Sequence, residues 1–156
     1  MASVPGRPLL IGWKEYVGLP EWGIRRLKAK VDTGARTSAL DVASYSLHEV
    51  AGEGLMAELQ VIYGRRHAPH SRVVRVPVAR MVVVCNSGGM REQRPLIEAE
   101  VQLGPVVKRI GLTVTNRAGM LFRMILGRQA LAGDFVVDVS QKYLLKRLEP
   151  RDTAQG

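Results

Sequence analysis

The residues best suited to chemistry are Asp32-Thr33-Gly34, which follow an apolar, strand-like segment ending at Val31. A carboxylate fixed at the end of a strand can act as a general acid or base. A glycine two positions later lets its backbone N–H approach that carboxylate, because no Cβ stands in the way. The threonine hydroxyl can bond a neighbouring backbone group. The same residues also suit an ordinary turn, in which aspartate caps the bend and glycine takes a positive φ, so the tripeptide alone leaves both interpretations open.

A second motif, Ile125-Leu126-Gly127-Arg128, joins two apolar residues to a Gly-Arg pair ahead of a short helical segment. Between the two motifs, residues 81–104 favour two strands connected by a glycine-rich turn. Together these features resemble the retropepsin-like aspartic proteases. Single-domain subunits of that family combine an apolar-Asp-Thr-Gly-Ala motif, a glycine-tipped flap and a late apolar-apolar-Gly-Arg motif.

The resemblance implies a role for each residue of these motifs. The catalytic residue would be Asp32. The residues that support the catalytic loop would be Thr33, Gly34 and Ala35. The late structural motif would be Ile125, Leu126, Gly127 and Arg128. The flap tip would consist of Asn86, Ser87, Gly88, Gly89 and Met90.

Several strings narrow the resemblance to one bacterial subfamily, whose members are commonly named ATP-dependent zinc proteases. These strings are KVDTGARTSAL, REQRPLI, LTVTNR, MILGRQAL and VVDVSQKYLL, and the similarity spans roughly residues 9–146. Members are often linked with an ATP-grasp ligase that adds glutamates to the C-terminus of a small-subunit ribosomal protein. The resemblance therefore implies an acidic peptide or protein tail as substrate, with a glutamate-extended ribosomal protein as one such partner.

Two departures separate the chain from retroviral subunits. Those subunits carry an aspartate directly after Asp-Thr-Gly-Ala, which pairs with the arginine of the late motif, whereas this chain has Arg36. Arg128 must then bind another group, and the alternatives are Asp134, Asp138 or a substrate carboxylate. Residues 41–80 also exceed what a minimal retroviral subunit holds at that point, so we expect an inserted hairpin there.

The implied mechanism needs two aspartates, and each chain supplies one. We therefore expect a homodimer with twofold symmetry that brings both copies of Asp32 together. Two carboxylates in contact share one proton, because both cannot be ionised at once. The ionised one would activate a water molecule, and the protonated one would bond the scissile carbonyl.

Zinc and ATP chemistry lack the residue patterns that they need. Zinc hydrolases use about three protein ligands; the candidates here are His48, His67, His70 and Cys85, with no His-Glu-x-x-His motif. Pro69 prevents a helix from holding His67 and His70 in register, so solvated loop histidines are the favoured interpretation. The phosphate-binding string Gly-x-x-x-x-Gly-Lys-Ser/Thr does not occur. We therefore expect no metal and no cofactor.

The net charge of +9 is concentrated in one part of the chain. The segment from Gly64 to Arg94 contains seven arginines and a single acidic residue, Glu92. Such a cluster can be a solvated face that aids solubility, or a wall over the cleft that binds carboxylates through bidentate guanidinium contacts. With the nearby Arg36, the candidate substrate-binding residues are Arg36, Arg65, Arg66, Arg72, Arg75, Arg91 and Arg94.

Composition narrows the remaining classes of protein. Aromatic residues are 5% of the chain, which argues against nucleic acid as the partner because single strands need stacking platforms. One cysteine excludes an internal disulfide, and no apolar run is long enough for a membrane span. The N-terminus shows no signal-peptide pattern, so we expect a cytoplasmic protein.

Two alternatives to a peptidase stay open: a non-catalytic peptide- or RNA-binding domain associated with the ribosome, and a basic structural protein of the ribosome.

Apolar residues recur at every second position along most of the 156-residue chain, which is typical of half-buried strands. Clear examples are residues 27–31, 55–62, 97–103, 110–114 and 135–139. With glycine- and asparagine-rich breaks between them, they predict an all-β fold, here a retropepsin-like acid-protease barrel with one short helix near the C-terminus.

The helical candidates are Ser38–Leu47 and Gly127–Leu131. We expect a single domain at residues 9–148, because no low-complexity linker interrupts this range. A flexible leader is expected at residues 1–8 and a flexible tail at residues 149–156.

Overall fold

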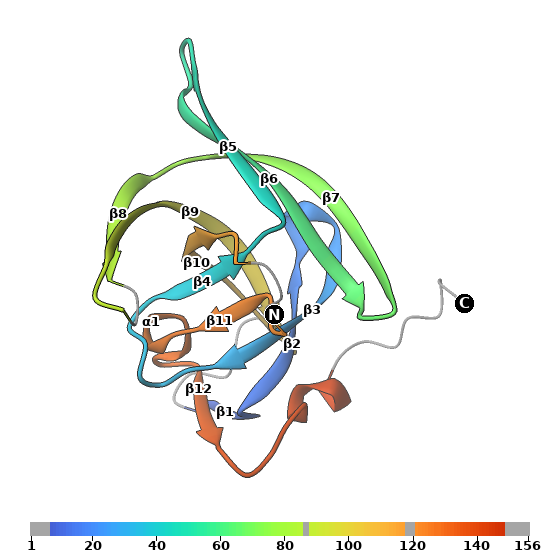
Figure 1. The fold of residues 1–156 in the computed structure, drawn as a ribbon. Coiled ribbons are helices and arrows are strands. Elements are labelled where there is room, and N and C mark those ends of the chain that lie inside the picture. Colours follow the sequence, from blue (N-terminus) through green and yellow to red (C-terminus); the bar gives the residue numbers. More distant parts are fainter. Residues whose placement is uncertain (1–6, 86–87, 118–120, 149–156) are drawn as a thin grey trace.

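Strands make up most of the chain in this computed structural model, which describes residues 7–85, 88–117 and 121–148 (Figure 1). The strands are β1 (Leu9–Gly12), β2 (Lys14–Leu19), β3 (Ile24–Val31), β4 (Ser38–Asp41), β5 (Ser44–Val50), β6 (Gly54–Arg65), β7 (Ala68–Pro77), β8 (Arg80–Cys85), β9 (Arg91–Leu103), β10 (Val106–Thr115), β11 (Met124–Leu126) and β12 (Phe135–Asp138). The helical elements are the 3-10 turns η1 (Pro20–Trp22) and η2 (Leu144–Leu148) and the α-helix α1 (Arg128–Leu131).

The expectation of a mostly β fold with a short helix near the C-terminus is confirmed. Most of the expected leader and all of the expected tail lie outside the described residues. Within the described part of the chain, no helix is long and apolar enough to span a membrane.

The largest sheet places the two sequence motifs side by side. Its strand order is β10-β4-β11-β3-β2-β9-β8, and β10 also pairs with β9. Within it, β11 lies between β4 and β3, antiparallel to the first and parallel to the second. The segment after β3, which begins with Asp32, therefore emerges beside the segment after β11, which begins with Gly127 (Figure 1). β1 and β12 form a separate two-stranded parallel sheet.

Alternate residues of these strands face a common apolar core. On β3, Leu27, Ala29 and Val31 are buried, whereas Lys28 and Lys30 lie on the opposite, more exposed face. Burying a leucine or valine side chain stabilises the fold by about 1.5–3 kcal/mol. The strand that leads into Asp-Thr-Gly is thus anchored on one face and leaves its basic face accessible.

The helix predicted for Ser38–Leu47 is wrong, because this segment forms β4 and the start of β5. β4 is inserted between two other strands: Leu40 lies opposite Val114 of β10 and Met124 of β11. Both edges of β4 are therefore paired, and such pairing overrides a weak local preference for helix.

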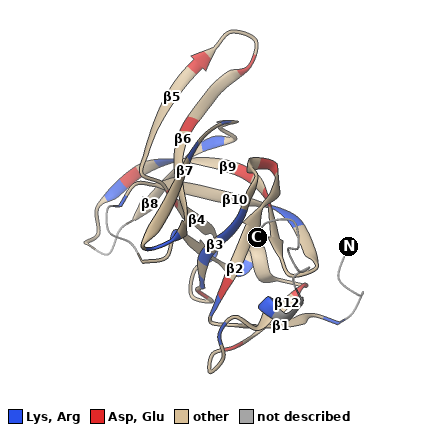
Figure 2. Ribbon diagram, turned by 90° about the vertical axis from the view of Figure 1, so that its right-hand side faces the viewer, with Lys and Arg blue, Asp and Glu red and all other residues tan. Residues whose placement is uncertain are grey.

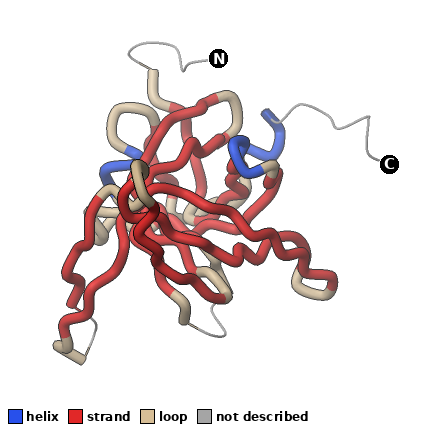
Figure 3. Tube along the Cα trace, turned by 90° about the horizontal axis from the view of Figure 1, so that it is seen from above, coloured by secondary structure: helices blue, strands red, loops and turns tan. Residues whose placement is uncertain are grey.

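The segment between β4 and β8 forms a separate three-stranded sheet in the order β5-β6-β7. Both pairings are antiparallel, so the insertion expected at residues 41–80 consists of two consecutive hairpins that share β6. Leu59 and Val61 of β6 are buried in the core, whereas the β5–β6 turn projects from the body (Figure 1). Figure 3 shows the β6–β7 and β8–β9 hairpins extending to opposite sides of the molecule.

Candidate active site

Asp32 is held where the chain leaves β3. Its backbone N–H donates to the carbonyl of Leu126 at 2.9 Å, which continues the parallel pairing of Val31 with Leu126 by one further bond. The Asp32 carbonyl in turn accepts from the N–H of Ala35 at 3.1 Å and closes a tight turn. The side chain of Asp32 is exposed, so its carboxylate is available to a substrate or to a second copy of the chain.

Gly34 orients the Asp32 carboxylate directly. Its backbone N–H donates to Asp32 Oδ1 at 3.0 Å. A Cβ at Gly34 would lie 3.2 Å from that same oxygen, which is tighter than ordinary van der Waals contact. Gly34 does not have a positive φ. Glycine is therefore used here for close approach to a carboxylate, as in the first interpretation of the tripeptide, and not for a left-handed turn.

The start of α1 fixes the remainder of the catalytic loop. The N–H groups of Arg128 and Gln129 donate to the carbonyls of Ala35 and Arg36 at 2.8 and 3.0 Å. The Arg128 guanidinium reaches back and donates through Nη1 to the carbonyl of Thr33 at 3.0 Å. Three bonds from the first two residues of α1 thus hold the backbone of the loop at Thr33, Ala35 and Arg36.

The partner of Arg128 differs from the aspartates considered in the sequence. Asp134 instead bonds Lys108 Nζ at 2.6 Å, and Asp138 accepts from the N–H and hydroxyl of Ser140. The Thr33 carbonyl takes the place of the retroviral aspartate as the partner of Arg128. The chain therefore needs no acidic residue at position 36 to hold its Gly-Arg motif against the Asp32 loop.

Gly127 lies at the tightest point of this arrangement. Its N–H donates to the buried hydroxyl of Ser38 at 3.0 Å. An added Cβ would lie 2.5 Å from the Thr37 carbonyl oxygen and 2.9 Å from that of Ala35. The backbone of Gly127 is extended, at φ −89° and ψ 178°, so close packing rather than an unusual φ requires glycine here. Ile125, which precedes this position on β11, is half-buried.

The flap predicted from the sequence is an antiparallel hairpin of β8 and β9, in register from Arg80 opposite Leu96 to Cys85 opposite Arg91. Of the predicted tip, Gly88, Gly89 and Met90 are exposed, and Gly89 has a positive φ of 80°. Asn86 and Ser87 lie outside the described residues.

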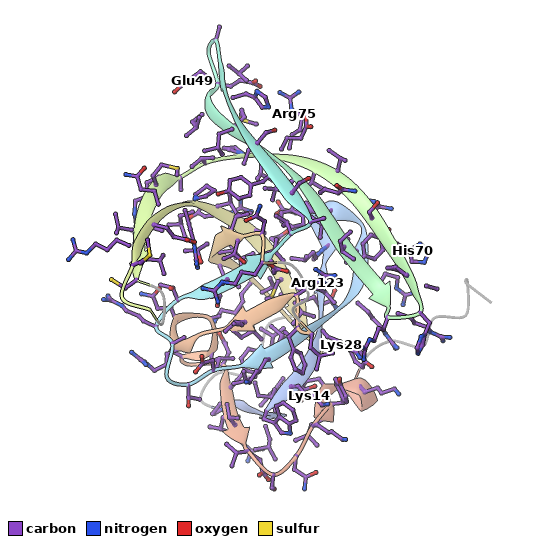
Figure 4. The ribbon with its side chains drawn as sticks, in the orientation of Figure 1. Lys14, Lys28, Glu49, His70, Arg75 and Arg123 are labelled. Atoms are coloured by element: carbon purple, nitrogen blue, oxygen red, sulfur yellow. The ribbon has the colours of Figure 1, made fainter. Side chains whose placement is uncertain are left out.

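The predicted arginine cluster is divided among several locations. Figure 2 shows basic residues spread over many strands, without a single basic element. Arg65 and Arg66 lie at the β6–β7 turn, whereas Arg72 donates to the carbonyl of Trp22. Arg75 lies near the projecting end of the hairpins in Figure 4, far from Lys28 and Arg123.

The other three predicted arginines surround the catalytic loop and the flap. Arg36 is exposed within the catalytic loop, and Arg91 is exposed at the start of β9. Arg94 is buried, with 6% of its surface exposed, and pairs with Glu92. A buried Arg94 is not part of an open basic wall.

A buried carboxylate that the sequence analysis missed lies next to the active-site motifs. Asp41 is 3% exposed and accepts from Thr115 Oγ1 at 3.0 Å, from the Arg117 N–H at 2.6 Å and from Arg123 Nη1 at 3.2 Å. These groups and Arg94 line a small pocket of about 50 Å³. The one available signal was a polar residue at the end of an apolar strand, which does not reveal its distant partners.

The candidate zinc ligands are not brought together. His48 on β5 bonds the hydroxyl of Ser46, and His70 on β7 stacks on Tyr63. Among residues 7–85, 88–117 and 121–148, no group of three or more His, Cys, Asp or Glu side chains could hold a metal ion.

A mostly β domain in which an Asp-Thr-Gly loop is bonded to an Ile-Leu-Gly-Arg motif has the arrangement expected of a retropepsin-like domain. A family model described as the retropepsin-like aspartic endopeptidase RimB matches residues 10–148, and the chain belongs to this RimB-like family. The resemblance drawn from the sequence motifs is thereby confirmed.

Curated relatives carry a different kind of name. The chain is 34% identical over 137 residues to a probable alpha-L-glutamate ligase of Shewanella pealeana and 33% identical over 159 residues to one of Desulfotalea psychrophila. These alignments cover 87% and 94% of the chain, but only 30% and 33% of the relatives. The chain thus spans about a third of the length of the curated relatives that it matches.

A solved structure shares the fold. It is the crystal structure of Lpg0085, a protein of unknown function from Legionella pneumophila, with a TM-score of 0.71 and 23% sequence identity. The match covers 89% of this chain and 99% of that protein. At this identity the likeness concerns the fold alone.

Proposed function

We propose that this protein is an aspartic-type peptidase that works as a homodimer, with one Asp32 from each subunit. The observation that carries the proposal is the exposed Asp32 carboxylate, which Gly34 orients and which the Ile-Leu-Gly-Arg motif holds in a bonded loop. Each chain has one Asp-Thr-Gly sequence. A twofold axis close to Asp32 would place the two carboxylates together.

The chemistry follows from two carboxylates that share a proton. The ionised Asp32 removes a proton from a water molecule, whose oxygen attacks the scissile carbonyl carbon. The protonated Asp32 of the other subunit donates to the carbonyl oxygen as the tetrahedral intermediate forms. Collapse of the intermediate breaks the C–N bond, and a carboxyl proton passes to the leaving amine. No covalent link to the enzyme is formed.

The neighbouring residues fix this geometry. Gly34 donates a hydrogen bond to one oxygen of the carboxylate, which restricts its rotation. Arg128 and Gln129 hold the loop backbone from the side of α1. The β8–β9 hairpin would close over the bound peptide and exclude water.

We infer that the substrates are acidic peptides, including protein tails extended by glutamate such as that of a ribosomal protein. The net charge of +9 favours an acidic partner. Related sequences also form about a third of longer proteins named probable alpha-L-glutamate ligase. A domain found in one polypeptide with such a ligase is well placed to act on glutamate-containing chains.

The proposal is tested by incubating the protein with a peptide that ends in a run of glutamates and with a matched peptide in which glutamine replaces glutamate. Mass spectrometry should show defined shorter products, formed faster from the glutamate peptide. If neither peptide is cleaved across a wide pH range, while the glutamate peptide still binds, the protein is a non-catalytic binding domain.

We expect peptide cleavage to survive removal of metal ions, because carboxylates alone supply the acid and the base. Rates measured after dialysis against EDTA should stay within about twofold of the untreated rate, since no step uses a metal-bound water. A zinc hydrolase assayed in parallel controls for complete chelation. Loss of activity that added Zn²⁺ restores would assign the reaction to a metal centre instead.

A further inference from the structure

A groove of about 340 Å³ lies between the β6–β7 turn, β3 and the residues before β11. Four basic residues contribute to its walls: Lys28, Arg65, Arg66 and Arg123. Among the described residues, no Asp or Glu lines this groove. Arg65 and Arg66 come from the β6–β7 turn, Lys28 comes from β3, and Arg123 directly precedes β11.

The sheet register connects the groove to the catalytic loop. Met124 of β11 lies opposite Ala29 of β3, so the preceding residue, Arg123, comes opposite Lys28. Figure 4 shows Lys28 and Arg123 in the same central region of the molecule. Lys28 precedes Asp32 by four residues, which corresponds to about 13 Å along an extended strand. The groove therefore begins about four extended peptide residues from the carboxylate.

Gly64 shapes the other wall. It has a φ of 91°, which glycine adopts readily, and an added Cβ would lie 2.9 Å from His70 Cδ2. Gly64 lies immediately before Arg65 and Arg66, near the end of the twelve-residue strand that finishes at Arg65. Both arginines line the groove, although β6 belongs to the separate three-stranded sheet.

We propose that this groove binds the acidic segment of a peptide, through carboxylates that pair with Lys28, Arg65 and Arg66. This inference rests on the proposed function, because it places the acidic segment about four residues from the bond that Asp32 cleaves. Arg123 already pairs with the buried Asp41 at 3.2 Å, which offsets its charge, so no peptide carboxylate is assigned to it. Guanidinium groups bind carboxylates in bidentate fashion, which suits closely spaced glutamates.

The aromatic contacts favour a peptide over a single-stranded nucleic acid. Binding of bases requires aromatic rings on which they can stack. The aromatic residue in the described lining is Tyr63. Its ring is stacked with His70 at 5.5 Å between centroids and has the Arg72 guanidinium 5.7 Å from its centre. Tyr63 is thus engaged within its own sheet.

The test measures binding without catalysis. The 156-residue chain carrying Asp32→Asn is titrated against fluorescein-labelled hexaglutamate and hexaglutamine, with fluorescence anisotropy as the readout. A triple variant, Lys28→Gln with Arg65→Gln and Arg66→Gln, removes three charges from the groove. A matched triple variant, Arg7→Gln with Lys142→Gln and Lys146→Gln, removes three charges from exposed residues outside the groove lining.

We expect the groove variant to bind hexaglutamate about tenfold more weakly and the matched variant to change the Kd by less than about twofold, because several exposed ion pairs act together. Equal losses in both variants would show that the whole positive charge, not the groove, attracts the peptide, and would overturn the inference. Tighter binding of a single-stranded oligonucleotide than of hexaglutamate at equal salt would overturn it as well.

This result is separable from the fate of the proposed function. Binding to the Asp32→Asn protein does not depend on hydrolysis. If the groove variant binds hexaglutamate more weakly but the wild type cleaves no peptide, only the proposed peptidase activity is refuted. If the wild type cleaves peptides but the groove variant binds hexaglutamate as well as the unmodified groove does, only the proposed binding site in the groove is refuted.

Discussion

Replacing Asp32 with asparagine is expected to lower the rate of peptide hydrolysis by at least about a hundredfold, the range that general acid–base groups contribute. Asparagine has nearly the same shape, and its carbonyl oxygen can still accept the Gly34 N–H that now bonds Oδ1 at 3.0 Å. It cannot take a proton from water at neutral pH. The loss should therefore fall on kcat, while peptide binding and the thermal unfolding midpoint stay close to those of the wild type.

Asp138→Asn is the matched control, because it removes one negative charge from another aspartate, which is half-buried at the end of β12 and lies outside the Asp32 loop. It should keep wild-type kcat. If Asp32→Asn turns over peptides at a comparable rate with unchanged circular dichroism, Asp32 takes no part in the chemistry. If Asp138→Asn were instead inactive, the catalytic carboxylate would lie at the end of β12.

The second large effect is expected for Gly127→Ala. The new Cβ would lie 2.5 Å from the Thr37 carbonyl oxygen and 2.7 Å from its carbon, and both belong to the backbone. Backbone groups cannot rotate away as a flexible side chain could, so the catalytic loop or α1 must shift. Overpacking of this kind costs about 1–3 kcal/mol. Chemical denaturation should show that loss of stability, and hydrolysis should fall at least about tenfold because small displacements of catalytic groups are costly.

Gly111→Ala controls for the general effect of adding a methyl group to a glycine in this sheet. A Cβ there would lie 3.4 Å from Leu96 Cδ1, an ordinary contact with a movable side-chain atom. It should change stability by less than about 1 kcal/mol. A Gly127→Ala protein as stable and active as the Gly111→Ala protein would show that the packing of the late motif against the loop does not set the active-site geometry.

Local sequence signals predicted the strands and the Asp-Thr-Gly loop well. Leu27, Ala29 and Val31 alternate with Lys28 and Lys30. The structure buries the first three, leaves Lys28 half-buried and exposes Lys30. The prediction that Gly34 lets an N–H approach the Asp32 carboxylate matches the observed bond. Both features depend on residues close together in the chain, where spacing and geometry are directly related.

Features that depend on distant segments were not predictable from the sequence. The buried carboxylate of Glu15 accepts the N–H groups of Gly12, Leu144 and Leu145 at 2.7, 2.9 and 3.1 Å, and its C-terminal partners are far away in sequence. Nothing in the residues near Glu15 indicates those contacts. The same reasoning applies to Asp41, whose partners follow β10 and precede β11.

The division of the arginine cluster has the same origin. Arg65, Arg66, Arg72 and Arg75 are neighbours in sequence, but a hairpin turn separates the first two from the others. The chain then combines Arg65 and Arg66 with Lys28 of a different sheet. Charge counted along the chain therefore identified a basic region without showing which residues share a surface.

The central claim is that two copies of Asp32 from two subunits form one active site, and mixed dimers test it most directly. Wild-type and Asp32→Asn proteins are combined at constant total concentration, and native mass spectrometry of differently tagged subunits verifies that they exchange. If each site needs both aspartates, mixed dimers are inactive and activity follows the square of the wild-type fraction, so an equal mixture keeps about a quarter of the activity. Activity that falls in simple proportion, to about half at the equal mixture, would show that each chain acts alone and would contradict the shared pair of aspartates.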